Sequence, residues 1–156
     1  MKLWRLARDP HTAFGGAGAQ AKGGRYVSAG RPVVHCASEA GLAVLVALRY
    51  VLDDKALFAA EHFLCHVEVQ AVPDRMPDGL TDRQIKAHAD AWLATGDSML
   101  MAIRSAVLPE GDVILLNPRH RDAGQVGPMV WRPFRFSDCL HRPPILDAYR
   151  GGPGAS

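Results

Sequence analysis

The chain has 156 residues, of which 48% are hydrophobic and 22% are charged. This length suits one domain, and this composition is that of an ordinary globular protein, which excludes disorder over the whole chain. No apolar run approaches the roughly 18 to 20 residues that a membrane helix needs. Lys2, Arg5 and Arg8 stand near the start, but no apolar signal-peptide core follows them. We therefore expect a cytoplasmic protein that binds no membrane.

The net charge and the cysteine spacing argue against a nucleic-acid-binding protein and against a protein built on zinc sites or disulfides. The formal net charge of +2 is spread along the chain and forms no basic stripe, so nothing indicates direct binding to nucleic acid. Cys36, Cys65 and Cys139 are odd in number and lack the paired spacing of a zinc site or a disulfide framework. We expect all three to be buried, reduced thiols.

The first predicted elements surround a glycine-rich segment. Residues 2–8 alternate well enough to form an edge strand that leads into the Asp9-Pro10 turn. Residues 14–30 contain six glycines and predict a loop in which the backbone approaches something closely. A short strand follows over residues 32–37.

A helix is expected next. Ser38 is a suitable N-cap, and the helix formers after it continue to Val51. Because this helix is apolar on nearly all sides, we expect it to be buried.

The alternation of residues 61–70 predicts a strand. In a strand Cys65 points away from His62 and His66, so we expect no metal site there. Residues 73–79 predict a turn-rich loop. Thr81 then caps a helix from Asp82 to about Thr95, which ends at Gly96.

Three more strands are expected over residues 98–103, 113–116 and 129–136, and the last residues form a frayed tail. We place one folded domain over residues 1–150 and a disordered tail over residues 151–156. Strands at both ends with helices in the middle indicate a mixed α+β domain.

Generic catalytic motifs do not occur. The sequence has no Walker A motif, no GxGxxG between a strand and a helix, no HExxH and no GxSxG. Arginine, glycine and aromatic residues gather near the start instead, at Arg5, Gly23-Gly24-Arg25-Tyr26 and His35. Guanidinium groups bind phosphate oxygens in a bidentate manner, and glycine lets backbone amides approach, so this group could cradle phosphates.

Four segments in order resemble the RES domain, the toxin half of a class of bacterial toxin–antitoxin modules. They are WRLAR, FGGAGAQAKGGRYVSAGRPVVHCAS, the apolar helix, and AIRSAVLPEGDVILLNPRHRD, and together they cover roughly residues 3 to 142. The resemblance implies the fold of ADP-ribosyltransferase toxins, a single α+β domain with a split, mixed sheet and flanking helices. It also implies NAD as a substrate, with no metal, and a cognate antitoxin as a partner.

The resemblance implies one of two activities. Some RES domains release nicotinamide from NAD by hydrolysis or phosphorolysis. Others, the ParT type, are NAD-dependent mono-ADP-ribosyltransferases that modify a host protein, phosphoribosyl pyrophosphate synthetase.

Only some of the polar residues that are typical of the family occur at the matching positions of this sequence. Arg5, Arg25 and Ser105 match, and Tyr26 replaces a tryptophan. His35 stands where the family has a tyrosine, and Val46 stands where it has a glutamate.

These positions define the candidate site. The resemblance makes Arg5, Arg25, Tyr26, His35 and Ser105 candidates for NAD binding, with His35 and Ser105 also candidates for catalysis. The imidazole would hold a ribose, and the serine hydroxyl would orient the nicotinamide ribose or the diphosphate.

A carboxylate that stabilises the developing ribosyl cation is missing from position 46. Glu39, at the start of the apolar helix, and Glu68, on the strand, are alternatives. Asn117 and His120 are expected to fix a turn by bonds from side chain to backbone.

Three functions therefore stay open. The first is transfer of ADP-ribose from NAD to a protein. This reaction depends least on the missing glutamate, because the acceptor protein supplies its own nucleophile. The second is an NAD glycohydrolase or phosphorylase that depletes NAD. The third is a degenerate, non-catalytic domain that only binds an antitoxin.

Overall fold

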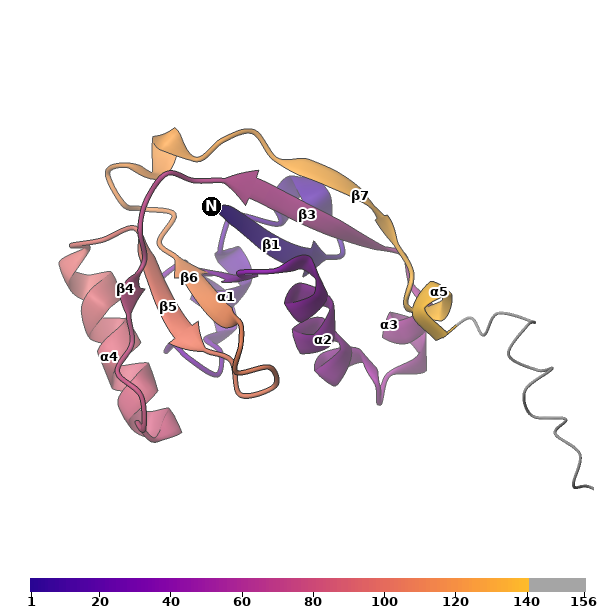
Figure 1. The fold of residues 1–156 in the computed structure, drawn as a ribbon, viewed down its shortest axis with the longest axis horizontal. Coiled ribbons are helices and arrows are strands. Elements are labelled where there is room, and N and C mark those ends of the chain that lie inside the picture. Colours follow the sequence, from indigo (N-terminus) through magenta and orange to yellow (C-terminus); the bar gives the residue numbers. More distant parts are fainter. Residues whose placement is uncertain (141–156) are drawn as a thin grey trace, which may run out of the picture.

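The computed structural model describes residues 1–140 and contains one seven-stranded sheet with helices against it (Figure 1). The strands are β1 (Lys2–Ala7), β2 (Val34–Ala37), β3 (His62–Glu68), β4 (Asp74–Arg75), β5 (Leu100–Arg104), β6 (Asp112–Leu116) and β7 (Val130–Phe134). Their order in the sheet is β4-β5-β6-β2-β1-β3-β7, and only β4 and β5 run parallel. The sheet is thus mixed, and the expected α+β class is confirmed.

The sheet comes close to dividing between β1 and β2. The ladder between these strands contains one residue pair, Trp4 with Ala37, whereas β1 pairs with β3 along its whole length. Figure 1 shows β1, β3 and β7 as one group and β5, β6 and β4 as another. The position of β1 inside the sheet shows that the edge strand expected over residues 2–8 was wrong, since β4 and β7 form the edges.

The helices are α1 (Ala17–Lys22), α2 (Ala40–Val51), α3 (Lys55–Ala59), α4 (Asp82–Thr95) and α5 (Phe136–Leu140), with short 3-10 turns η1 (Pro10–Thr12) and η2 (Ala123–Gln125). Helix α4 packs Ala89, Trp92 and Leu93 against the side chains on one face of β5 and β6. The alternate residues of these strands lie in a second cluster on the other face. Both faces are therefore buried, which is why the two strands are continuously apolar.

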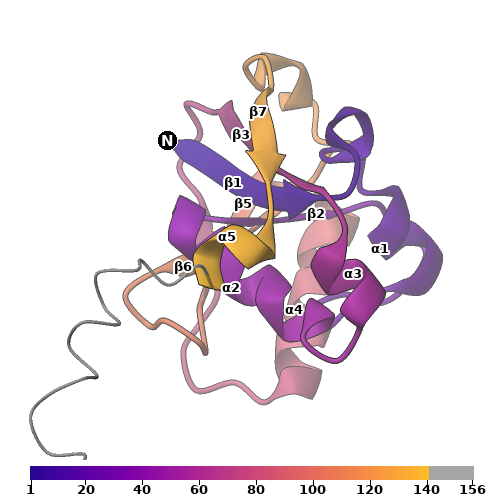
Figure 2. The same ribbon diagram turned by 90° about the vertical axis from the view of Figure 1, so that its right-hand side faces the viewer.

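Helix α2 covers the β1 side of the sheet with one face only (Figure 2). Leu42, Ala43 and Val51 are buried, but Leu45 is 39% and Tyr50 is 69% exposed, so the expectation of a wholly buried helix was wrong. Its N-cap is Glu39, not Ser38. The Ser38 hydroxyl instead accepts the backbone N–H of Asp112 at 3.0 Å.

The glycine-rich segment contains helix α1 as well as loop. Gly16 and Gly23 flank this helix with φ of 71° and 68°. A Cβ on Gly23 would lie 2.9 Å from the backbone nitrogen of Ala29, so the turn leaves no room for a side chain. Helix α3 and strand β4, each five residues or fewer, were not expected from the sequence.

The last expected strand is shorter than the sequence predicted. The expected strand over residues 129–136 stops at Phe134, and Phe136 begins α5. The expected domain end at residue 150 and the tail 151–156 lie outside the described residues. No helix within residues 1–140 is both long enough and apolar enough to cross a membrane.

Helix α4 begins and ends as the sequence predicts. The Thr81 hydroxyl accepts the N–H of Gln84 at 3.3 Å, the Gln84 side chain accepts the N–H of Thr81 at 2.9 Å, and Gly96 ends the helix with φ of 65°. This capping box satisfies backbone donors that have no partner inside the helix.

We expect Thr81→Ala to lower the free energy of unfolding by about 1 kcal/mol, because the first turn loses its side-chain acceptor. Urea unfolding followed by circular dichroism measures the change. Thr81→Ser keeps the hydroxyl and should lose much less. Equal losses in both variants would show that the cap does not stabilise the helix.

Candidate functional site

A cleft of about 510 Å³ opens where β1 and β2 diverge. Its walls are the second half of β1, strand β2, helix α2, and helix α1 with the glycine segment that follows it. Among the site residues expected from the sequence, Arg5, Arg25, Tyr26 and His35 line this cleft together, and Ser105 does not.

Arg5 bridges the gap between the two halves of the sheet. Its Nη1 donates a hydrogen bond of 2.8 Å to the backbone carbonyl of His35, on β2. Its Nε is buried and has no partner within the described residues. The bond holds the guanidinium at the floor of the cleft, where its positive charge faces any ligand that enters.

His35 lies below the glycine segment. A Cβ added to Gly24 would lie 3.5 Å from Cε1 of the ring, and the Tyr26 ring is 6.0 Å away between centroids. Burial, together with the charge of Arg5, lowers the pKa of His35 from 6.5 to about 4. The imidazole is therefore neutral at pH 7 and presents one donor and one acceptor nitrogen.

Arg25 and Tyr26 lie on the segment that follows α1. The Arg25 guanidinium is 5.5 Å from the centre of the Tyr26 ring and 3.5 Å from a carboxylate oxygen of Asp82, at the start of α4. Burial raises the pKa of Tyr26, so its hydroxyl keeps its proton. This part of the cleft thus offers a cation and a hydroxyl donor.

No aspartate or glutamate within the described residues lines the cleft. Val46, which the family resemblance aligns with a glutamate, lines it and packs against apolar neighbours. Glu39 caps α2 and Glu68 pairs with Lys2 at 3.7 Å, both outside the lining. Burial raises the pKa of Cys36 to about 12, which rules out a thiolate nucleophile at neutral pH.

Ser105 lies in the connection between β5 and β6. It is 2% exposed, and its hydroxyl oxygen accepts the backbone N–H groups of Val107 and Leu108, both at 3.2 Å. In this structure the hydroxyl shapes a turn. Any contact of Ser105 with a ligand would need that turn to rearrange.

The turn role expected for Asn117 and His120 is confirmed. Asn117 accepts the N–H of Arg119 at 3.0 Å, and the His120 ring accepts the N–H of Asp122 at 3.1 Å. 

The cysteines follow expectation in part. Cys36 and Cys65 are buried, whereas Cys139 is exposed, so the prediction of three buried thiols was wrong for the last. No group of three or more metal-ligating side chains occurs within residues 1–140.

Arg8, Tyr50 and His62 also line the cleft, although the sequence did not predict them as site residues. Arg8 follows β1, and Tyr50 lies one helical turn beyond Val46 on α2. His62 is held at 2.9 Å from the carbonyl of Ala60 and meets the Phe136 ring edge-on. The spacing of Val46 and Tyr50 on one helix face was the only signal that could have identified one of them in advance.

The fold and the cleft define an α+β domain with an arginine-lined, glycine-rimmed site that suits a phosphate-bearing ligand. The chain belongs to the RES domain family, whose family model matches residues 2–137.

Curated proteins of this family are similar over most of the chain. A protein of Photorhabdus laumondii named "Toxin Res" is 30% identical, with 78% of this chain and 85% of the relative covered. A protein of Sphingobium named "Prs ADP-ribosylating toxin" is 29% identical, with 78% and 84% covered. A "Toxin Res" of Yersinia enterocolitica is 28% identical, with 78% and 86% covered.

The lowered pKa of His35 makes the folded protein sensitive to acid. Between pH 6.5 and about 4 the unfolded chain binds a proton at this residue that the folded chain does not. The stability that depends on neutral His35 is complete above pH 6.5 and is lost as the pH falls toward 4. The loss should be on the order of 2 to 3 kcal/mol by about pH 4.5.

His35→Phe tests this, because the variant keeps a ring and the backbone carbonyl that Arg5 binds but cannot titrate. Urea unfolding at about pH 7 and at about pH 4.5 should show a smaller acid loss in the variant. His62, whose pKa burial also lowers, is present in both proteins, so the difference isolates His35. A loss that is equal in both proteins would contradict a lowered pKa at His35.

Proposed function

We propose that this chain is a RES-domain toxin that binds NAD in the cleft and transfers ADP-ribose to a protein. One observation carries the proposal: the cleft gathers Arg5, Arg8 and Arg25 beside a glycine-rich backbone and contains no carboxylate within the described residues. The name of the Sphingobium relative, an ADP-ribosylating toxin, supports the same activity. The proposed site of action is the cytoplasm.

The cleft matches the parts of NAD. Guanidinium groups supply the positive charge that a diphosphate requires and can bind its oxygens in pairs. The neutral imidazole of His35 can donate to a ribose hydroxyl, and the Tyr26 ring offers a flat surface against which a base could stack. Arg5, Arg25, Tyr26 and His35 are thus the proposed binding residues. Ser105 would join them only after its turn rearranges.

Transfer demands less of this cleft than hydrolysis does. In either reaction the bond between ribose C1′ and nicotinamide breaks, nicotinamide leaves with the bonding electrons, and a nucleophile bonds to C1′. Hydrolysis needs a base to take a proton from water, and His35, with a pKa of about 4, is a weak base. A protein acceptor brings its own nucleophile, and its proton passes to solvent.

Phosphorolysis is the second candidate. Phosphate is already an anion, so it needs no general base, and the same arginines would attract it. This reaction would deplete NAD without labelling a protein.

The proposed partners are a cognate antitoxin and a protein acceptor, such as phosphoribosyl pyrophosphate synthetase. Beside the cleft, α2, α3 and the residues between them expose Leu45, Tyr50, Leu52 and Leu57. These apolar side chains offer a contact surface next to the cleft. An antitoxin that covers it should bury on the order of 1,000 Å² or more in total.

We expect Arg25→Ala to abolish transfer of labelled ADP-ribose from NAD to lysate protein while the thermal unfolding midpoint changes little. The side chain makes a 3.5 Å ion pair with Asp82 and lies 5.5 Å from the centre of the Tyr26 ring, and partly exposed contacts of both kinds are worth little to stability. Gel analysis of the labelled protein bands measures the transfer.

Two control variants separate binding from structure. Arg83→Ala removes an exposed arginine that lines no part of the cleft and should transfer normally. Asp82→Asn removes the ion pair but keeps the guanidinium, and should also transfer. If Asp82→Asn is as inactive as Arg25→Ala, the arginine acts through the loop and not through NAD. The degenerate, non-catalytic alternative would be supported if wild type neither labels protein nor consumes NAD.

We expect Val46→Glu to raise nicotinamide release in the absence of any acceptor protein. The new carboxylate would enter the cleft beside the bound ribose, where it can polarise water. Val46→Gln is the matched control, because it has the same shape without the charge. Release is compared at equal folded fraction by circular dichroism, since a carboxylate among apolar neighbours costs stability. No increase over Val46→Gln would show that position 46 does not serve the reaction.

A further inference from the structure

His62 lines the cleft but has no role in the proposed binding of NAD. It is the first residue of β3 and is 5% exposed. Arg8, which follows β1, also lines the cleft. The ladder that pairs Ala7 with Phe63 brings the end of β1 beside the start of β3. His62 and Arg8 therefore belong to the same end of the cleft.

The backbone fixes the hydrogen of the His62 ring on one nitrogen. Nδ1 lies 2.9 Å from the carbonyl oxygen of Ala60, and a carbonyl oxygen can only accept. The hydrogen is therefore on Nδ1, and Nε2 of the neutral ring carries a lone pair. Nε2 makes no hydrogen bond to another described residue, and it is not among the buried polar atoms that lack a partner. The lone pair is thus open to a ligand in the cleft.

The His62 ring is neutral at pH 7. Burial lowers its pKa from 6.5, the bond to Ala60 opposes this change, and the positive charge of Arg8 adds to it. A neutral ring with its hydrogen on Nδ1 has no donor at Nε2, so it cannot bind an oxygen of a phosphate or a carboxylate. The ligand group that meets Nε2 must therefore be a donor.

NAD has three kinds of donor, which are the amino group of adenine, the amide of nicotinamide and the ribose hydroxyls. His35 is already the proposed partner of a ribose hydroxyl. The nicotinamide ring carries a positive charge, and Arg8 has no carboxylate within ion-pair distance in the described part of the chain. Arg25, by contrast, has a carboxylate at 3.5 Å. Adenine is neutral and flat, and Val51 and Leu57 add apolar side chains to the lining, so adenine suits this end best.

We propose that His62 recognises the adenine of NAD, with Nε2 accepting a hydrogen bond from the 6-amino group. This inference rests on the proposed function, because it assigns one end of NAD to one end of the cleft. A base with an oxygen in place of that amino group, such as hypoxanthine or guanine, would turn its own lone pairs toward Nε2. The bond would be lost and the acceptor would stay unpaired away from water, which is costly. The cleft thus selects an adenine nucleotide.

The test is a titration of the full chain with NAD and with nicotinamide hypoxanthine dinucleotide, in which an oxygen replaces the 6-amino group. Isothermal calorimetry without an acceptor protein should show NAD binding about tenfold more tightly. In His62→Phe the two ligands should bind equally, because the variant keeps a ring against Phe136 but has no acceptor. A purely structural role of His62 would weaken both ligands together and leave their ratio unchanged.

His88→Phe is the matched control, because it replaces an exposed histidine of α4 that does not line the cleft, and it should keep the tenfold ratio. A second measurement needs no variant. In wild type labelled with nitrogen-15, the Nε2 signal of the His62 ring should move when NAD binds and move much less with the hypoxanthine dinucleotide. Nicotinic acid adenine dinucleotide keeps the adenine, so it should move the signal as NAD does.

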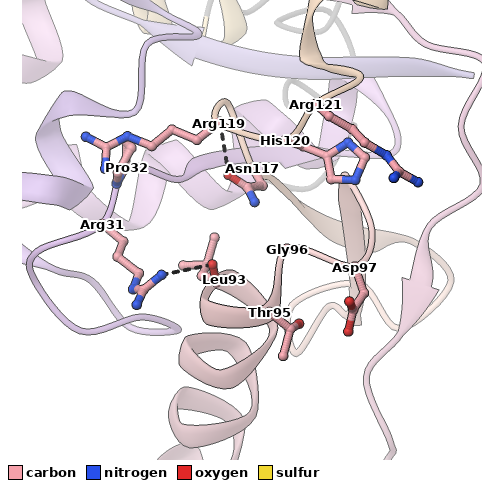
Figure 3. Close-up of a pocket in the computed structure, with 10 residues that line it drawn as sticks. All are labelled: Arg31, Pro32, Leu93, Thr95, Gly96, Asp97, Asn117, Arg119, His120 and Arg121. Atoms are coloured by element: carbon pink, nitrogen blue, oxygen red, sulfur yellow. Dashed lines mark hydrogen bonds between the residues drawn. The ribbon is translucent and has the colours of Figure 1, made fainter.

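A separate pocket of about 470 Å³ is a place where a dinucleotide could bind without meeting His62. Its lining includes Arg31 and Arg119, which could attract a diphosphate, and it shares no lining residue with the cleft (Figure 3). Backbone amide signals distinguish the two places, because Gly24 lines the cleft and Gly96 lines this pocket. NAD should shift the signal of Gly24.

Four results would overturn the proposal. Equal binding of the two dinucleotides by wild type would show that the 6-amino group is not recognised. A tenfold ratio that persists in His62→Phe would assign the recognition to another residue. Amide shifts at Gly96 and none at Gly24 would place the ligand outside the cleft. Binding of neither dinucleotide by wild type would overturn the proposed function as well, which distinguishes that failure from the first three.

Discussion

The bond from Arg5 to the carbonyl of His35 is the interaction on which the cleft depends. If the antiparallel pairing of Trp4 with Ala37 continued, Leu6 would face His35 and the strands would lie about 4.8 Å apart. No ligand could then enter between them. The strands separate instead, and the Arg5 guanidinium reaches the His35 carbonyl across the gap at 2.8 Å. A side chain thus replaces the backbone ladder, and a buried acceptor keeps its partner.

This arrangement also sets the electrostatics of the cleft. The charge of Arg5 acts with burial to keep His35 neutral, while burial keeps the Cys36 thiol protonated. With Tyr26 also protonated, the groups around Arg5 that face a ligand at neutral pH are cations and neutral donors. Such a site is suited to holding an anion, but it is poor at removing a proton. The chemistry of the cleft therefore favours a nucleophile that arrives already reactive, whether from a protein acceptor or as phosphate.

Local chemistry explains which parts of the fold the sequence could predict. Helix α4 follows from its own caps, Thr81 with Gln84 at the start and Gly96 at the end, and β3 follows from strict alternation. The grouping of Arg5, Arg25 and His35 was expected from the arginine, glycine and aromatic residues near the start of the chain, and the family resemblance supported it.

The remaining features depend on contacts that a one-dimensional pattern does not contain. Alternation in β1 cannot show that both of its edges are paired, and an apolar α2 cannot show that one face stays exposed. The Ser105 hydroxyl accepts two backbone N–H groups in the turn after β5. The identity of the residue alone cannot show this role. A pocket lined by Arg31 and Arg119 was not expected, since only the fold brings its segments together.

Helix α4 holds the segment that carries Arg25 at three points. Near its start Asp82 pairs with Arg25, further along Asp90 accepts the N–H of Ser28 at 2.9 Å, and near its end the carbonyl of Leu93 accepts from Arg31. One capped helix thus holds the whole segment from Arg25, at the cleft, to Arg31. The place of Arg25 beside the cleft therefore depends on α4, whose first turn is fixed by the capping box of Thr81 and Gln84.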